Sequence, residues 1–498
     1  MAVATCLVIS GALYGYVRFK LDSIRTLSAP HLSKTVSGAD GAGGLQPENI
    51  LLIGNQSRAD ISRSEAQNFG SPTALSGSLS DVIMILHLDP AKNTASLLSI
   101  PRDLFVPMPP GSPVGSYQKI DAALNDGKKG PDNLIQAITT DFGIPINHFV
   151  ELEFDGFQST VNALGGISVY FPEPLFDRQS GLWVAAPGCT HLNGAAALAL
   201  VRARHLQYDP PGDTAPRTSW PYDPESDLSR IVRDHTFLRV LASTAKSQGL
   251  TNPITLNSFL GAIINQITID PGLKSQLIAV ASHYRHLNPD GIPEMTLPVT
   301  TVGGAYGYPY NGANIGDVDF PVQPADNQVI SQWDGSAFPK PNPPSQVNVY
   351  NLAGGYNLAT KTASTLRADG LATTIGGNRP VPASTTETFV DYPAGGLAQA
   401  LYVANYLTGA VMLYQDPALP PGTVNVEAGS LLAVVQPIVA TGTASGGPST
   451  TVARSTAPTT TPTTLSVPTP GGQKPSAASD QNQPWDPTPC PAKTASNR

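Results

Sequence analysis

Residues 80–103 read SDVIMILHLDPAKNTASLLSIPRD, and this stretch indicates the fold of the first half of the chain. Its two apolar runs, residues 82–88 and 95–100, are each short enough to be a buried strand. The residues between them, Asp89 to Asn93, have turn composition, so the two strands are expected to form a hairpin. A further apolar run at residues 50–53 predicts another buried strand.

Helical and strand patterns alternate downstream of this hairpin. Helices are predicted near residues 131–142, 157–164, 195–200, 228–245, 255–266 and 272–286, and strands near 149–154 and 167–171. This mixture indicates the α/β class, with helices packed on a central sheet. The helices at 157–164 and 195–200 are apolar almost all round, so they either fill a core or line a slot for a long lipid chain.

A second pattern follows the Pro-rich stretch PKPNPP at residues 339–344, within a linker placed at 337–345. Residues 346–437 predict a small α/β domain. Its strands are expected near 347–350, 371–375, 386–390 and 411–413, and its helices near 358–366 and 397–407. Residues 438–498 are rich in Thr, Pro and Ser with few large apolar residues, so this tail is expected to be disordered.

The N-terminus predicts a membrane anchor at residues 1–17 and a stalk at 18–47. Residues 2–17, AVATCLVISGALYGYV, are apolar and uncharged, and basic residues follow them. A spanning helix needs about 20 such residues, so the anchor is expected to begin upstream. The segment shows no small-residue cleavage site, which favours a retained anchor over a removed signal peptide.

Composition narrows the functional classes. Only 13% of the 498 residues are charged and the net charge is −8, which disfavours nucleic-acid binding and makes a DNA-binding regulator the least favoured reading. Of the three cysteines, Cys6 lies in the apolar run. Cys189 and Cys490 could join core and tail in an oxidising compartment, and two unpaired thiols are an equally open alternative. The cysteine spacing does not indicate a zinc site.

Arginine is the most informative residue type, because six arginines lie near the ends of predicted strands and helices. They are Arg58, Arg102, Arg202, Arg204, Arg230 and Arg233. Taken singly, each is more often a surface or ion-paired residue. Guanidinium groups from several segment ends could nevertheless converge on one phosphate group, which their planar fork binds through two hydrogen bonds.

Two carboxylates and two serines accompany these arginines. Asp81 precedes a predicted strand and either holds Mg²⁺, which prefers one or two carboxylates plus phosphate oxygens, or is a turn residue. Asp103 either forms an ion pair with Arg102 or acts as a general base. Ser57 and Ser99 are potential nucleophiles, but the surrounding sequence lacks the GxSxG motif of serine hydrolases.

These residues together resemble the LytR-CpsA-Psr family. The resemblance is carried by ILLIGNQSR (50–58), SDVIMILHLD (80–89), LSIPRD (98–103), KIDAALNDG (119–127), GCTHLNGAAALALVRAR (188–204) and DLSRIVRDHTFL (227–238). Residues 346–437 resemble the small C-terminal domain of many actinobacterial members, through the motif VNVYNLAGGYNLA. Two departures are Gln56, where the family often has a metal-binding Asp, and Asp234, where it commonly has Gln.

The resemblance implies an α/β/α sandwich over residues 48–336 with a mixed sheet and a hydrophobic cleft for a polyprenyl tail. The six arginines would surround a pyrophosphate, and Asp81 would hold Mg²⁺ or Mn²⁺. Arg102, Asp103, Arg202 and Arg204 would form the catalytic centre. The implied reaction moves a glycan phosphate from a polyprenyl pyrophosphate to a peptidoglycan hydroxyl, on the outer side of the cell membrane.

Two alternatives use the same lipid. One is a non-catalytic protein that binds lipid-linked glycan, which the Gln56 departure and the long tail favour. The other is a pyrophosphatase that releases phosphorylated glycan without an acceptor.

Overall fold

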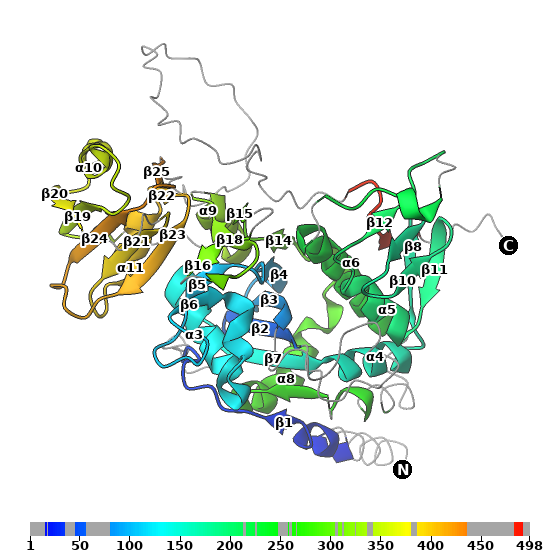
Figure 1. Cartoon of the computed structure of the whole chain (residues 1–498). Helices are drawn as coiled ribbons and strands as arrows, with labels where there is room; N and C mark the ends of the chain where they lie inside the picture. Colours follow the sequence, from blue (N-terminus) through cyan, green and yellow to red (C-terminus); the bar gives the residue numbers. More distant parts are fainter. Residues whose placement is uncertain are drawn as a thin grey trace, which may run out of the picture. The chain divides into compact units, whose positions relative to one another are not determined.

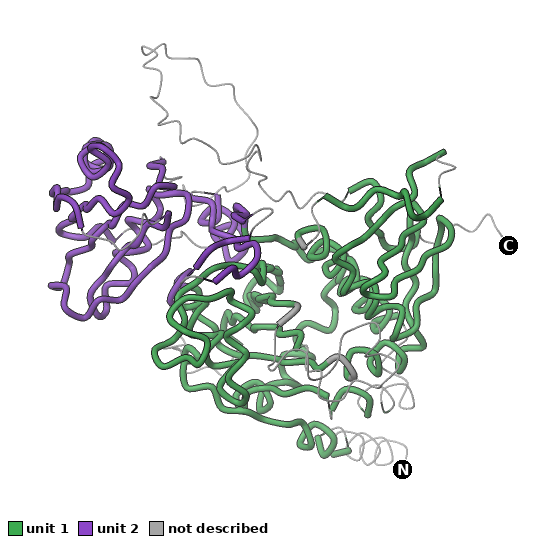
Figure 2. Tube along the Cα trace, viewed as in Figure 1, with its two compact units in different colours: residues 1–139, 144–297, 478–498 green, residues 140–143, 298–477 purple. Residues whose placement is uncertain are grey.

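The structure is a computed structural model. It describes residues 15–16, 18–34, 45–55, 80–212, 216–224, 227–247, 257, 261–264, 266–303, 307–310, 313–323, 325–335, 342–379, 386–435 and 483–491. The chain forms two compact units, coloured separately in Figure 2. Unit 1 comprises Met1–Thr139, Ile144–Leu297 and Ala478–Arg498, and unit 2 comprises Thr140–Gly143 and Pro298–Ala477.

A seven-stranded mixed sheet lies at the centre of unit 1, in the order β1-β13-β7-β2-β3-β4-β14 (Figure 1). Its strands are β1 (Arg25–Thr26), β2 (Glu48–Asn55), β3 (Ser80–Asp89), β4 (Thr94–Ser99), β7 (His148–Glu153), β13 (Ile267–Ile269) and β14 (Glu294–Thr296). The predicted hairpin is confirmed, because β3 and β4 are antiparallel and Asp89 pairs with Thr94. Strand β2 is antiparallel to β3 but parallel to β7.

The helices of unit 1 lie close to their predicted positions. They are α3 (Gly130–Phe142), α4 (Phe154–Ala163), α5 (Gly194–Val201), α6 (Asp227–Ser247) and α8 (Pro271–His283). Asn193 caps α5 by accepting a hydrogen bond from the amide of Ala196. Gly194 allows α5 to approach α4, since a Cβ atom there would lie 2.3 Å from the Gln158 carbonyl oxygen. Of the helix predicted at 255–266, the structure describes residues 257, 261–264 and 266, and residues 257 and 261–263 are helical.

Short strands extend unit 1 beyond the central sheet. They are β5 (Phe105–Pro107), β6 (Tyr117–Lys119), β8 (Ile167–Phe171), β9 (Leu175–Asp177), β10 (Leu182–Val184), β11 (Gly188–Leu192), β12 (Gln207–Tyr208) and β26 (Thr488–Pro489). Strand β26 belongs to the tail, and it pairs with β8 in the sheet β11-β8-β26.

The prediction of disorder is therefore wrong for residues 483–491. Cys490 forms a disulfide with Cys189, with their Cα atoms 5.7 Å apart, and Trp485 stacks on Tyr208. A covalent link and one partly buried ring fix a segment whose average composition is that of a disordered chain. The rest of the predicted tail, residues 438–482 and 492–498, lies outside the described residues.

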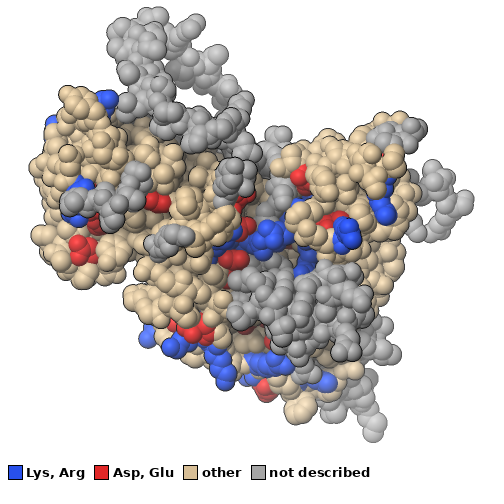
Figure 3. Space-filling view, viewed as in Figure 1, with Lys and Arg blue, Asp and Glu red and all other residues tan. Residues whose placement is uncertain are grey.

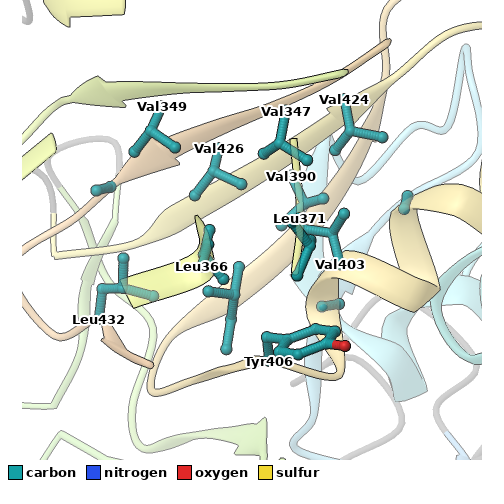
Figure 4. Packing of buried hydrophobic residues seen from close by; sticks show 14 of the residues in the cluster. Val347, Val349, Leu366, Leu371, Val390, Val403, Tyr406, Val424, Val426 and Leu432 are labelled. Atoms are coloured by element: carbon teal, nitrogen blue, oxygen red, sulfur yellow. The ribbon is translucent and has the colours of Figure 1, made fainter. Parts of the chain in front are cut away.

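Unit 2 contains a five-stranded sheet in the order β20-β19-β24-β21-β23. The strands are β19 (Gln346–Asn351), β20 (Thr373–Asn378), β21 (Thr388–Tyr392), β23 (Val411–Gln415) and β24 (Thr423–Ala428), with helices α10 (Leu358–Ala368) and α11 (Leu397–Ala404). The sequence predictions missed β24, a central strand with the alternation Val424, Val426 and Ala428. Valines of β19, β24 and β21 gather around Leu366 and Val403 in one buried cluster (Figure 4).

Residues 298–335, assigned from sequence to the first domain, cluster with unit 2 instead. They form β15 (Val299–Val302), β16 (Pro309–Tyr310), β17 (Ala313–Asn314), β18 (Val318–Pro321) and α9 (Ala325–Asp334). Strands β15 and β18 pair with each other and do not join the seven-stranded sheet. Strands β22 (Leu407–Thr408) and β25 (Ala433–Val434) complete the unit.

Among the residues that the structure describes, no helix is both long and apolar enough to cross a membrane. Residues 1–14, which contain most of the predicted anchor, are outside that set.

Candidate active site

A cluster of charged side chains follows the end of β4. The Asp103 carboxylate lies 2.7 Å from Lys119 Nζ, 3.5 Å from Arg102 Nε and 4.0 Å from Arg204 Nη2. Arg102 is only 8% exposed, whereas 37% of the Arg204 side chain is exposed. One carboxylate thus brings together three cationic side chains, from the ends of β4, β6 and α5.

Lys119 is the member of this cluster that the sequence reasoning missed. It ends β6 and lies in the quoted segment KIDAALNDG. A single lysine in a short strand has no periodicity or spacing that marks it as functional, so only the resemblance of the whole segment could have pointed to it.

Arg202 and Arg204 follow directly after α5, which ends at Val201. The Arg202 amide still donates to the Leu198 carbonyl at 3.1 Å. The amides of Arg204 and His205 instead donate to the buried Asp177 carboxylate, each at 2.8 Å. Asp177 therefore fixes the backbone that carries the paired arginines.

Arg230 and Arg233 lie inside unit 1, with exposures of 2% and 0%. Arg230 Nε is 4.0 Å from an Asp234 carboxylate oxygen. Arg233 Nη1 donates to Asp223 at 3.0 Å and to Asp486 at 3.2 Å, and Nη2 donates to the Ala203 carbonyl at 2.8 Å. The guanidinium of Arg233 thus donates hydrogen bonds to protein groups. One of these groups is the carbonyl of Ala203, the residue between Arg202 and Arg204.

Three residues named in the sequence analysis lie outside the described residues. They are Gln56, Ser57 and Arg58. Asp81 is in β3, next to Val82, but its side chain is not described.

Ser99 is a buried structural residue. Its Oγ lies 2.6 Å from His235 Nε2 on α6, and the residue is 1% exposed. Burial, together with the nearby positive charge of Arg239, lowers the pKa of His235 to about 4. The neutral imidazole can therefore take part in a hydrogen bond that joins β4 to α6, and Ser99 is not presented to solvent as a nucleophile would be.

An apolar cavity of about 230 Å³ lies between the central sheet and the helices α4, α5 and α6. Its lining comprises Leu52, Ile53, Gly54, Val82, Met84, Val150, Leu152, Phe157, Thr160, Leu198, Val201, Asp234, Phe237, Leu238 and Leu241. The two apolar helices noted in the sequence therefore do border a hollow space. Residues adjoining the lining carry the charges, since Val201 precedes Arg202 and Asp234 contacts Arg230.

On the face viewed in Figure 3, basic and acidic side chains lie side by side in one hollowed area.

No group of three or more His, Cys, Asp or Glu side chains suited to a metal occurs among the described residues. The side chains described around Asp103 are cationic, so they suit phosphate oxygens better than a metal ion.

Two family models match the chain. Residues 26–319 match the model of the LytR_cpsA_psr family. Residues 345–431 match a model described as LytR cell envelope-related transcriptional attenuator.

Three similar proteins with established names share parts of the chain. It is 32% identical over 225 residues to the probable cell wall biosynthesis protein LcpB of Corynebacterium glutamicum, covering 45% of this chain and 48% of that one. Identity to LcpA of the same species is 27% over 297 residues, 55% and 53% of the two chains. TagV of Bacillus subtilis, a polyisoprenyl-teichoic acid–peptidoglycan teichoic acid transferase, is 38% identical over 130 residues. The match covers 25% of this chain and 32% of TagV. The chain thus spans about half the length, or less, of these relatives.

Two solved structures are similar at lower identity. The LytR-Csp2A-Psr enzyme from Actinomyces oris gives a TM-score of 0.43 at 23% identity, covering 62% of this chain and 93% of that one. The B. subtilis TagV structure gives 0.41 at 23% identity, covering 58% and 95%.

Proposed function

The chain belongs to the LytR-CpsA-Psr family, and on that premise we propose that unit 1 is a glycopolymer–peptidoglycan phosphotransferase. It would move a glycan phosphate from a polyprenyl pyrophosphate carrier to a peptidoglycan hydroxyl. The observation that carries this proposal is the apolar cavity whose lining residues adjoin Arg202 and Arg230. The lipid chain of the substrate needs an apolar site, and its pyrophosphate needs a cationic site next to it.

The binding step follows from the side chains. The polyprenyl chain would occupy the cavity, where removal of apolar surface from water favours binding. Arg102, Arg202, Arg204 and Lys119 would surround the pyrophosphate, with Arg230 and Arg58 as further members of the proposed set. Charge-assisted hydrogen bonds from these groups would offset the cost of removing phosphate oxygens from water.

In the chemical step, the acceptor hydroxyl oxygen would attack the phosphorus that carries the glycan. The bond from that phosphorus to the bridging oxygen would break, and polyprenyl phosphate would leave with the electron pair. Phosphoryl transfer depends mainly on positioning and charge neutralisation, which the cationic side chains supply. Asp103 holds these cations in place and is our candidate for the base that takes the hydroxyl proton.

A divalent metal is part of the proposal through Asp81. Its strand position next to cavity-lining Val82 fits a site with one carboxylate and substrate oxygens, the ligands that Mg²⁺ prefers; Mn²⁺ is an alternative. When bound, the ion would neutralise charge on the phosphates. Gln56 in place of the family's Asp predicts weak metal affinity.

We also propose that the protein faces the cell wall, anchored by residues 1–17. The disulfide between Cys189 and Cys490 supports this, because such bonds persist in oxidising compartments outside the cytoplasm.

The test incubates the full chain with a polyprenyl-pyrophosphoryl glycan, peptidoglycan and Mg²⁺, and measures polyprenyl phosphate. Release should require peptidoglycan, and Arg102→Ala should lower the rate about 10²- to 10³-fold. Arg379→Ala in unit 2 is the matched control and should have no effect. Release without an acceptor would indicate a pyrophosphatase, and lipid binding without release would indicate a non-catalytic binder.

A further inference from the structure

The tail segment 483–491 is attached to unit 1 by contacts of three kinds. Strand β26 pairs with β8, and Cys490 is bonded to Cys189. The Trp485 ring lies parallel to the Tyr208 ring, with centroids 3.8 Å apart and an interplanar angle of 8°. A segment held at three points can place one side chain inside the unit with precision.

That side chain is Asp486, which is 1% exposed. One of its oxygens accepts a hydrogen bond from Arg233 Nη1 at 3.2 Å, and the other accepts from the Gln483 amide at 2.9 Å. The second carboxylate on Arg233 is Asp223, held by Ser229 Oγ at 2.9 Å. The tail therefore supplies one of two carboxylates that orient a fully buried guanidinium.

Arg233 passes this constraint to the paired arginines. Its Nη2 donates to the Ala203 carbonyl at 2.8 Å, and Ala203 is the residue between Arg202 and Arg204. From the other direction, Asp177 binds the Arg204 amide. The peptide unit that joins Ala203 to Arg204 is thus held by two charged side chains, Arg233 and Asp177, and the first of these is bound by the tail.

We propose that Asp486 is a positioning residue for the pyrophosphate site. It holds Arg233 and, through the Ala203 carbonyl, sets the directions of Arg202 and Arg204. This inference rests on the proposed function. It assigns a role in the active site to Asp486, which lies 253 residues from Arg233 in sequence.

The test measures binding and needs no turnover. Farnesyl pyrophosphate and farnesol are titrated into the full chain, because they share a prenyl tail and differ in the pyrophosphate. Wild-type protein should bind farnesyl pyrophosphate more tightly. Asp486→Ala should weaken farnesyl pyrophosphate about tenfold, the size expected for a lost charged hydrogen bond, and leave farnesol unchanged. A general loss of packing would weaken both ligands.

Thr488→Ala is the matched control, since Thr488 lies in the same segment and pairs with Tyr170 through its backbone. It should bind both ligands as wild type does. Equal farnesyl pyrophosphate affinity in Asp486→Ala and wild type would overturn the inference, and so would an equal loss for farnesol.

Cys490→Ser provides a second route if Asp486→Ala does not fold. It loosens the tail without touching Arg233, so it should lower farnesyl pyrophosphate affinity selectively. If limited proteolysis shows the tail released while affinity stays at the wild-type value, the inference is wrong. Failure of the proposed function has a different signature, because wild-type protein would then bind farnesol and farnesyl pyrophosphate equally well.

Discussion

Units 1 and 2 both pack helices on a mixed sheet, yet they use their apolar side chains differently. In unit 2, the valines of β19 and β24 form one buried cluster with Leu366 and Val403. In unit 1, apolar residues of β2, β3 and β7 face α4, α5 and α6 across a cavity of about 230 Å³. Similar strand and helix patterns therefore produce a filled core in one unit and a partly hollow one in the other.

The arginines of the two units also differ in the side chains around them. In unit 2, Arg379 lies 4.1 Å from the centre of the Tyr350 ring and pairs with Glu427. In unit 1, the cationic groups of Arg102, Arg204 and Lys119 all lie within 4.0 Å of the Asp103 carboxylate. This grouping of three cations around one carboxylate distinguishes the candidate site from the single Arg379–Glu427 pair of unit 2.

The largest difference between the units should appear on reduction. Only unit 1 contains both cysteines of the disulfide, which closes a sequence separation of 301 residues. Its reduction should destabilise unit 1 by about 4 kcal/mol, lowering its melting temperature by on the order of 10 °C. Calorimetry with and without dithiothreitol should show the unit 2 transition unchanged. A shift of both transitions, or of neither, would contradict the comparison.

Truncation of a leucine should cost more in the filled core. Leu366→Ala in unit 2 should lower the free energy of unfolding by about 3 kcal/mol, because it leaves a new cavity in a packed cluster. Leu241→Ala in unit 1 should cost about 1 kcal/mol, since Leu241 is partly buried and already borders empty space. Guanidinium denaturation of both variants measures the two values, and equal losses would show that the cavity is filled in solution.

Enlarging the same residue should affect binding. Leu241→Trp would occupy part of the cavity and should weaken farnesyl pyrophosphate and farnesol alike, by about tenfold or 1.4 kcal/mol. Ile375→Trp, at an exposed position of unit 2, is the control and should change neither affinity. If Leu241→Trp binds both ligands normally, the prenyl chain lies elsewhere.

The smallest expected effect is the pH dependence of the stability of unit 1. His148 Nδ1 lies 2.9 Å from Asp270, and Glu48 is also in contact. Burial opposes the charge of His148, but hydrogen bonds to the two carboxylates outweigh it and raise its pKa to about 9. The resulting stability is fully present below the ordinary histidine pKa of about 6.5 and is lost as pH rises through 9.

Unit 1 should therefore lose on the order of 1 kcal/mol between pH 6 and pH 10, a value reduced by screening from nearby water. His148→Gln should remove most of this loss. Chemical denaturation at both pH values tests the point, and an unchanged pH dependence in the variant would assign the effect to other groups.

The sequence predicted secondary structure better than packing. Strand β2 and helix α6 lie within a few residues of their expected bounds because apolar periodicity reports which residues are buried. The same periodicity describes Leu198 whether it fills a core or borders a cavity, so the choice between them needed coordinates. Strand β24 was missed although its valines alternate clearly.

The site was predicted in part. Arg102, Asp103 and Arg204 do come together, as expected for charged residues at the ends of neighbouring elements. The buried Arg233 contacts Asp486, from a tail whose composition hid an ordered segment. Long-range pairing of this kind leaves no local signal, and the two cysteines were the only indication of it in the sequence.

The bond between Cys189 and Cys490 turns most of the polypeptide into a covalently closed ring that includes all of β19 to β25. A protease that cuts once within that ring opens it but releases no fragment. Clipped and intact molecules would then migrate at the same mass on a gel unless a reductant is present. A single cut within the ring would in this way leave units 1 and 2 joined in one molecule.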